Sequence, residues 1–144
     1  MSNMRKLGLD YGDSRIGVAI SDGLGITTQG LETIHHNGND KMALKRLDEI
    51  LKLYEIDTIV IGMPINMDGT KTDRAEVTNK FIHKLKCKFP GILIETVDER
   101  LTTVAAHKTM NYLNINKNNK RNIVDTISAV YILETYMNRL KNES

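Results

Sequence analysis

The stretch from Leu7 to Asp22 constrains the fold most, because it has the pattern of two apolar strands joined by a tight turn. Leu7 and Leu9 share one face of the first strand by its two-residue alternation, so Gly8 and Asp10 share the other. The missing side chain of Gly8 allows another backbone or a ligand to come close to that second face. The pattern predicts a β-hairpin in which the Asp10 carboxylate lies at a strand end, beside open space.

The second strand of this hairpin follows the turn Tyr11–Ser14 and begins at Arg15. Its alternation places large apolar side chains on one face and small residues on the other, Ile16, Val18 and Ile20 against Gly17 and Ala19. An Asp beside a Gly is also ordinary turn chemistry, so the hairpin alone leaves Asp10 as either a turn residue or a functional one.

Length and composition set limits on the class of protein. The chain has 144 residues, enough for one domain with its own apolar core, so we expect a single domain over residues 1–144. A net charge of +2 does not by itself indicate a nucleic-acid-binding protein. No apolar run reaches the length of a membrane span or follows a basic start, so we expect no membrane and no secretion signal. The lone Cys87 excludes an intramolecular disulfide, and the expected location is the cytoplasm.

Beyond the hairpin, strand and helix patterns alternate, which predicts the α/β class. Asp57–Gly62 is apolar without alternation, as is typical of a parallel strand buried at the centre of a sheet. Asp40 is the expected cap of the first helix, and Met42 and Val77 are expected on the buried sides of the first two helices. His35–Asp40 is expected to be a loop and not a metal site, because adjacent histidines on extended backbone point apart. The remaining elements are expected at 25–34 (strand), 41–54 (helix), 72–88 (helix, from Thr72 or Asp73), 91–97 (strand), 102–113 (helix, capped by Thr102 or Thr103), 114–122 (polar loop) and 122–140 (helix).

The loop Gly62–Thr70 follows the carboxyl end of the central strand, where open α/β sheets bind ligands. Asn66 and Asp68 are therefore candidates for contact with a substrate. Turn formation by Asn and Asp explains both residues equally well.

Acidic residues follow another strand and interrupt the last helix. Asp98 and Glu99 come directly after the strand 91–97, and Asp125 lies in an otherwise apolar helix. A carboxylate in apolar surroundings is costly unless it is paired or bound to a metal, so Asp125 either lies on an exposed arc or points toward the other acids. Together with Asp10, these carboxylates are the ligands that two Mg²⁺ or Mn²⁺ ions, roughly 3.5–4 Å apart, need for phosphodiester hydrolysis.

Four ordered motifs resemble the YqgF/RuvX family, RNase H-like proteins described as Holliday-junction resolvases and as pre-16S rRNA nucleases. The motifs are Leu9–Gly12 with Arg15–Asp22, Gly62–Thr70, Asp98–Thr103 and Val124–Leu133. The resemblance covers nearly the whole chain. It implies a mixed sheet of order 3-2-1-4-5 flanked by helices. It also implies that Asp10, Glu99 and Asp125 are catalytic metal ligands, with Asp98 as the alternative to Glu99.

The same resemblance implies metal-dependent cleavage of phosphodiester bonds. The reaction would process the 5′ end of pre-16S rRNA in ribosome biogenesis or resolve branched DNA. The sequence leaves open the choice between structured RNA and branched DNA. It also leaves open a monomer or a weak homodimer, because cutting a four-way junction needs two active sites.

Two other classes of protein share parts of this pattern. Actin-like and sugar-kinase ATPases open on a similar strand-Asp-x-Gly hairpin, but they need two such domains and this chain has one such unit. A non-catalytic nucleic-acid-binding domain with the same fold is the third possibility. The three acids favour the enzyme over both alternatives.

Four cationic residues are candidates for contact with substrate phosphates, namely Arg15, Arg100, Lys120 and Arg121. Arg15 has Asp13 and Asp22 as alternative partners, and Arg100 has Asp98. Because no strongly basic face is evident, we expect modest affinity for nucleic acid that falls as the salt concentration rises.

Overall fold

The computed structural model describes residues 4–66, 68–70, 73–101 and 120–143, with side chains in the last range from residue 125. Strands and helices alternate after an opening run of three strands, as the α/β prediction requires. The elements are β1 (Arg5–Tyr11), β2 (Arg15–Ser21), β3 (Thr28–His35), α1 (Asp40–Leu53), β4 (Ile56–Met63), α2 (Asp73–Lys88), β5 (Leu93–Asp98), the short 3₁₀ helix η1 (Glu99–Leu101) and α4 (Lys120–Glu143).

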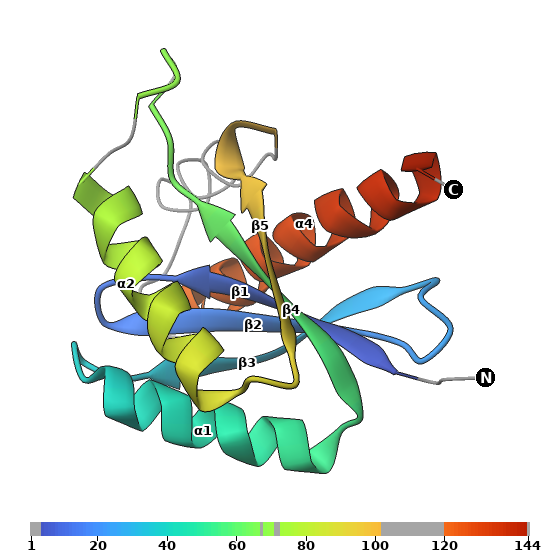
Figure 1. Cartoon of the computed structure of the whole chain (residues 1–144), viewed down its shortest axis with the longest axis horizontal. Coiled ribbons are helices and arrows are strands. Elements are labelled where there is room, and N and C mark those ends of the chain that lie inside the picture. The colour runs from blue at the N-terminus through green and yellow to red at the C-terminus, as the bar shows by residue number, and fades with distance from the viewer. Residues whose placement is uncertain (1–3, 67, 71–72, 102–119, 144) are drawn as a thin grey trace.

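The strands lie in the order β3-β2-β1-β4-β5, which confirms the predicted order. β1 is antiparallel to β2, with Asp10 opposite Gly17, and parallel to β4, with Leu9 beside Ile61. Figure 1 shows β1 in the middle of this twisted sheet. The apolar β1 and β4 are central because both of their faces are covered, whereas β3 carries polar residues such as Gln29 at the sheet edge.

Different helices cover the two faces of the sheet (Figure 1). Large aliphatic side chains, among them Leu9 and Ile61, pack against α1 and α2 on one face. The other face carries small residues such as Gly8 and Ala19, and α4 lies against it. The alternation predicted for the hairpin is confirmed, and the face that holds Gly8 and Asp10 is the α4 face.

The start of α1 differs from its prediction. Asn39 and not Asp40 is the N-cap, because the Asn39 side chain accepts hydrogen bonds from the backbone amides of Lys41 and Met42. The Asp40 carboxylate is instead bonded to Tyr11 and to a lysine of α2. Both residues are good caps, so only these tertiary contacts decide between them.

One residue that was expected on the buried side of each of α1 and α2 lies outside it. Met42 is half exposed and Ala43 is buried in α1. Val77 is exposed and Thr78 is buried in α2. Neighbouring residues on a helix point about 100° apart, so an apolar residue next to a buried stripe is easily counted into it from sequence alone.

The later part of the chain is described only in part. α4 begins at Lys120, so Lys120 and Arg121 belong to its backbone and not to a loop. The predicted helix over 102–113 and most of the polar stretch 114–122 lie outside the described residues. Among the described helices, none combines the length and the apolar character that a bilayer crossing requires.

The contact between β1 and α4 gives a test of this packing. A Cβ at Gly8 would lie 2.8 Å from both the Ala129 carbonyl oxygen and the Leu133 Cβ, whereas a Cβ at Gly91 would meet nothing within 4 Å. Gly8→Ala is expected to destabilise the fold by about 1–3 kcal/mol, because α4 must move away from the sheet. Gly91→Ala is the matched control and is expected to leave thermal unfolding nearly unchanged. Equal melting temperatures for the two variants would contradict the described packing of α4.

Candidate active site

Asp10 lies near the carboxyl end of β1, on the face that α4 covers. The residue is only 5% exposed. Its partner across the β1–β2 pair is Gly17. On the β4 side, Leu9 pairs with Ile61. Because the two strands are parallel, the next residue of β4, Gly62, stands beside Asp10. A carboxylate is therefore flanked on both neighbouring strands by residues without side chains.

Asp125 approaches from α4 on the β2 side. A Cβ at Gly17 would lie 2.0 Å from the Asp125 carbonyl oxygen, so the helix backbone rests directly on this glycine. Asp125 is 9% exposed as a residue, and its Oδ2 accepts a hydrogen bond of 2.7 Å from Arg15 Nε. Of the two positions left open for Asp125 by the sequence, the exposed one is excluded, because the residue is buried and paired with Arg15 of β2.

Glu99 approaches from the end of β5 on the β4 side. A Cβ at Gly62 would lie 2.9 Å from Glu99 Oε1 and 2.6 Å from Ile132 Cδ1 of α4. The Glu99 side chain therefore lies on the α4 face, over the residue that stands beside Asp10. Glycines on both sides of Asp10 thus bring Asp125 and Glu99 against the sheet from opposite directions. We call this arrangement of Gly17 and Gly62 the glycine pair.

Asp98 lies on the opposite face of β5. Its neighbour Val97 packs in the α4 cluster, so strand alternation turns Asp98 away from α4. Both Asp98 oxygens accept hydrogen bonds from the Arg100 side chain, the shortest being 2.7 Å, and these bonds hold the pKa of Asp98 below its usual value. Arg100 is thus paired with Asp98, one of the two roles that the sequence left open for it.

The β4–α2 loop shows the turn chemistry that was the alternative for Asn66 and Asp68. Asp68 Oδ1 accepts hydrogen bonds from the backbone amide and the hydroxyl of Thr70, at 2.9 and 2.7 Å. Asn66 Nδ2 donates to the same hydroxyl oxygen at 3.0 Å. The bonds from Thr70 hold the pKa of Asp68 below its usual value. Both side chains are used within the loop itself.

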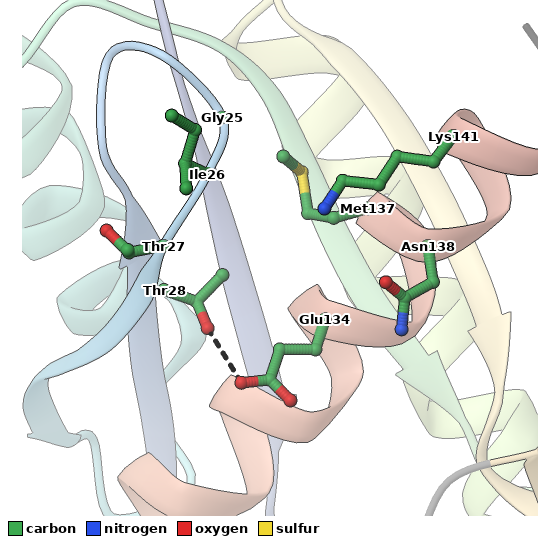
Figure 2. Close-up of a pocket in the computed structure, with 8 residues that line it drawn as sticks. All are labelled: Gly25, Ile26, Thr27, Thr28, Glu134, Met137, Asn138 and Lys141. Atoms are coloured by element: carbon green, nitrogen blue, oxygen red, sulfur yellow. Dashed lines mark hydrogen bonds between the residues drawn. The ribbon is translucent and has the colours of Figure 1, made fainter.

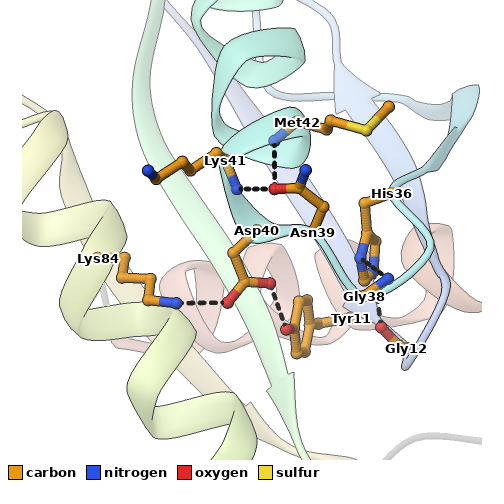
Figure 3. A network of polar contacts seen from close by, with 9 residues as sticks. All are labelled: Tyr11, Gly12, His36, Gly38, Asn39, Asp40, Lys41, Met42 and Lys84. Atoms are coloured by element: carbon orange, nitrogen blue, oxygen red, sulfur yellow. Dashed lines mark hydrogen bonds and ion pairs between the residues drawn. The ribbon is translucent and has the colours of Figure 1, made fainter.

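The turn that follows Asp10 is held by a network of polar contacts (Figure 3). Tyr11 donates from its hydroxyl to Asp40 Oδ1 at 2.7 Å, and Lys84 Nζ donates to Asp40 Oδ2 at 2.8 Å. His36 is fully buried, and its ring nitrogens bond the Gly12 carbonyl oxygen and the Gly38 amide. Burial and the bond to Asp40 raise the pKa of Tyr11 well above its usual value, so the phenol stays protonated. His36 lies in the stretch predicted as a loop without metal, and its two bonds are to backbone groups.

Arg74 is a contributor to this turn that the sequence analysis missed. Its guanidinium donates to the Tyr11 carbonyl oxygen at 3.0 Å, lies 5.7 Å from the Tyr11 ring centroid and pairs with Asp13. Phe81 stacks on the Tyr11 ring with centroids 4.2 Å apart. A single arginine at the start of a helix carries no motif, so only the three-dimensional contact shows this role.

The alternative partners proposed for Arg15 are engaged elsewhere. Asp13 pairs with Arg74, and Asp22 accepts hydrogen bonds from Ile26 and Thr27 in its own turn. The partner of Arg15 is Asp125, at the other end of the chain. The side chains of Lys120 and Arg121 lie outside the described residues.

The donor set around Asp10 suits a hard divalent cation, because carboxylate oxygens are the ligands that Mg²⁺ and Mn²⁺ prefer. The space that side chains at the glycine pair would fill is taken by the Asp125 backbone and by the Glu99 and Ile132 side chains. Within the part of the chain that the structure describes, however, no group of three or more His, Cys, Asp or Glu side chains is close enough to hold a metal ion. The described carboxylates therefore do not form a coordination cluster by themselves.

A separate cavity of about 360 Å³ lies between the β2–β3 turn and the second half of α4 (Figure 2). Ile26 and Met137 provide its apolar lining, and Glu134 accepts a hydrogen bond of 3.0 Å from Thr28 at its rim. The β2–β3 turn is at the opposite end of β2 from Gly17. The cavity is therefore remote from Asp10 and is not part of the candidate active site.

Comparison with solved structures assigns the class of fold. The chain is similar to Thermus thermophilus RuvC in complex with a Holliday junction substrate, with a TM-score of 0.59 and 13% identity over 95% of this chain and 96% of that one. A second T. thermophilus RuvC structure gives a TM-score of 0.57 at 12% identity, over 96% of this chain and 97% of that one. The fold is thus the RuvC-like, RNase H-like α/β fold.

Sequence comparison defines the family within that class. The chain belongs to the RuvX family, described as a Holliday junction resolvase, whose model matches residues 4–139. A relative from Ruminiclostridium cellulolyticum is 55% identical, over 95% of this chain and 96% of its own length. One from Acetivibrio thermocellus is 50% identical, over 93% and 95% respectively. Both are named "Putative pre-16S rRNA nuclease".

The polar network at Asp40 predicts a pH-dependent contribution to stability. Burial raises the pKa of Asp40, but the hydrogen bonds from Lys84 and Tyr11 outweigh burial and leave the pKa below its usual value of 3.8. The ionised carboxylate therefore stabilises the native state above that pH, and this stabilisation is lost as the pH falls through the lowered pKa. Asp40→Asn is expected to melt at a lower temperature than the parent at neutral pH, with the difference shrinking below about pH 4.

Thermal unfolding of both proteins over a pH series measures this difference. Asp48→Asn, which breaks only a surface pair with Lys52, is the control and is expected to have little effect. A difference for Asp40→Asn that stays constant down to strongly acidic pH would show that its carboxylate charge is not what stabilises the turn.

Proposed function

We propose that this protein is a metal-dependent nuclease that hydrolyses phosphodiester bonds, with Asp10, Glu99 and Asp125 as its catalytic, metal-binding carboxylates. The observation that carries the proposal is the glycine pair, which lets Asp125 and Glu99 approach from both sides of a buried aspartate. Arg15 compensates the charge of Asp125, and a divalent cation would compensate the remaining acids. Membership of the RuvX family supports the same assignment.

The cation is proposed to be Mg²⁺ or Mn²⁺, with two ions as in other phosphodiester hydrolases of this chemistry. When bound, such ions activate a water molecule and stabilise the leaving oxygen. Glu99 is proposed as a ligand in preference to Asp98, because the Glu99 side chain lies on the α4 face and Asp98 is bonded to Arg100 on the other.

The protein's own part in this reaction is to hold the carboxylates in place. Arg15 is proposed as a positioning residue, since its bond to Asp125 Oδ2 fixes that side chain beside β2. The Tyr11 contacts hold the backbone next to Asp10, and Arg100 keeps Asp98 away from the α4 face. Lys120 and Arg121, in the helix that also carries Asp125, remain the candidates for contact with substrate phosphates.

Structured RNA is proposed as the substrate, in the cytoplasm. The name of the two relatives points to the pre-16S rRNA precursor, whose 5′ end such an enzyme would process in ribosome biogenesis. Branched DNA is the second substrate, favoured by the description of the family. A monomer suffices to trim one RNA end, whereas a four-way junction needs two copies.

Cleavage by the Asp10→Asn variant tests the proposal. Purified protein is expected to cut structured RNA only with Mg²⁺ or Mn²⁺ present, and Asp10→Asn is expected to lower the rate at least about 10²-fold, because a neutral amide is a poor ligand for a divalent ion. The variant is expected to stay folded, since neutralising one of several like charges relieves their repulsion. Labelled RNA and branched DNA, each with and without chelator, measure the reaction. Cleavage that survives chelation would contradict the metal-dependent mechanism.

The neighbouring acids provide an internal comparison. Glu99→Gln is expected to lose activity as severely as Asp10→Asn, whereas Asp98→Asn is expected to retain much more, because its carboxylate faces away from α4. Parallel rate measurements on the two variants give the answer. A greater loss for Asp98→Asn would mean that the assignment of the two acids must be reversed.

A further inference from the structure

The second half of α2 concentrates the positive charge of the protein. Lys80–Lys88 contains four lysines and no acidic residue. The chain has 20 basic and 18 acidic residues in all, so the rest of it carries 16 basic and 18 acidic residues. The small net charge of +2 therefore conceals a basic segment on a slightly acidic protein.

Three of these lysines form one row along the helix. Lys80, Lys84 and Lys88 are four residues apart, which places them on one side of α2 at intervals of about 6 Å. Lys84 bonds Asp40 across the gap between α2 and α1, so this side of α2 faces α1 (Figure 3). Lys80 and Lys88 are exposed and form no ion pair with any residue that the structure describes. Lys86 points to the other side of the helix, because it lies two residues from both neighbours in the row.

Two further lysines follow Asp40 on α1. Lys41 and Lys45 lie one turn apart on one side of that helix, are exposed and, among the described residues, have no acidic partner. The acidic residues of the same helix are already used, since Asp48 pairs with Lys52 and Glu49 with Arg46. We call Lys41, Lys45, Lys80, Lys84 and Lys88 the lysine surface. Asp73 and Glu76 are in the first turn of α2, at the opposite end from Lys88.

We propose that the lysine surface binds the phosphodiester backbone of a nucleic acid, away from the carboxylates. Lysine ammonium groups on one surface repel one another, and a polyanion with regularly spaced charges relieves that repulsion while releasing its counterions. α1 and α2 cover the opposite face of the sheet from Asp10 (Figure 1). The surface therefore holds part of a long substrate outside the cleavage site. This inference rests on the proposed function for the identity of the polyanion, and it revises the expectation that no basic face exists.

Binding measured without cleavage tests the proposal. A fluorescein-labelled single-stranded RNA is titrated with the full chain in the presence of chelator, over a series of salt concentrations, by fluorescence anisotropy. The triple variant Lys45→Gln/Lys80→Gln/Lys88→Gln removes three cations and keeps Lys84, whose pair with Asp40 supports the fold. Each lost phosphate contact is expected to reduce the magnitude of the slope of log affinity against log salt by about 0.7. The three substitutions together are expected to reduce it by about two. Affinity near 0.1 M salt is expected to fall about tenfold or more.

A charge-matched control separates this surface from the overall charge of the protein. Lys86→Gln/Arg139→Gln/Lys141→Gln has the same net charge and is expected to keep most of the affinity and slope. Equal losses in the two triple variants, or no loss in the first, would overturn the proposal. So would displacement of the RNA by polyglutamate as readily as by unlabelled RNA, because the surface would then select acidic peptides as well. Chelator prevents metal-dependent cleavage, so the binding result stands independently of the outcome for hydrolysis.

Discussion

The close contact between the α4 backbone and the sheet glycines is the constraint on which the site depends. At Gly17 the helix carbonyl of Asp125 occupies the position of a Cβ, and at Gly8 the helix comes almost as near. Such contacts are possible only where the strand has no side chain. They fix the height and the rotation of α4 over β1 and β2, and therefore the place at which Asp125 meets the sheet. The apolar contacts of Ile132 and Leu133 with the same face hold the helix there.

This packing has an electrostatic cost that shapes the surroundings of the site. Asp10 and Asp125 are both buried, although aspartate is among the residues least often found in protein interiors. Arg15 provides Asp125 with a charged partner from the adjacent strand, and Arg74 and Lys84 provide cations around the following turn. Arg74 and Lys84 thus pair with acids on the other side of the sheet from α4, namely Asp13 and Asp40. Arg15 pairs with Asp125, which belongs to α4 itself. A fold that keeps acidic groups in such a position gains most when a divalent cation binds there.

Local patterns in the sequence were sufficient to predict which strands form and which face each residue of the hairpin occupies. The alternation in Leu7–Asp22 placed Gly8 and Asp10 on one face correctly, and the continuous apolar run at β4 identified the central parallel strand. The strand order followed from these apolar patterns together with the family resemblance. The predicted cap at Asp40 and the predicted burial of Met42 and Val77 were wrong, because only tertiary contacts distinguish these residues from their neighbours along the helix. The predicted catalytic roles of the three acids stay predictions.

Contacts between distant segments lay beyond what the sequence could provide. Arg15 and Asp125 are 110 residues apart, and no spacing rule connects them. Arg74 reaches Tyr11 from a helix that carries no recognisable motif. The run Lys80–Lys88 is the sequence signal for the lysine surface, but the nearly balanced total charge drew no attention to it. Only the pairing of Lys84 with Asp40 shows which side of α2 these lysines occupy.

The central claim is that the glycine pair gathers Asp10, Glu99 and Asp125 around one divalent-cation site. Anomalous diffraction from crystals of the protein soaked in Mn²⁺ tests this claim most directly, because it locates the metal without assuming its ligands. The account predicts manganese peaks on the α4 face of the sheet, within bonding distance of oxygens from all three carboxylates, at about 2.0–2.6 Å as for hard divalent ions. Manganese bound only elsewhere on the protein, with the three carboxylates engaged by protein groups alone, would contradict it.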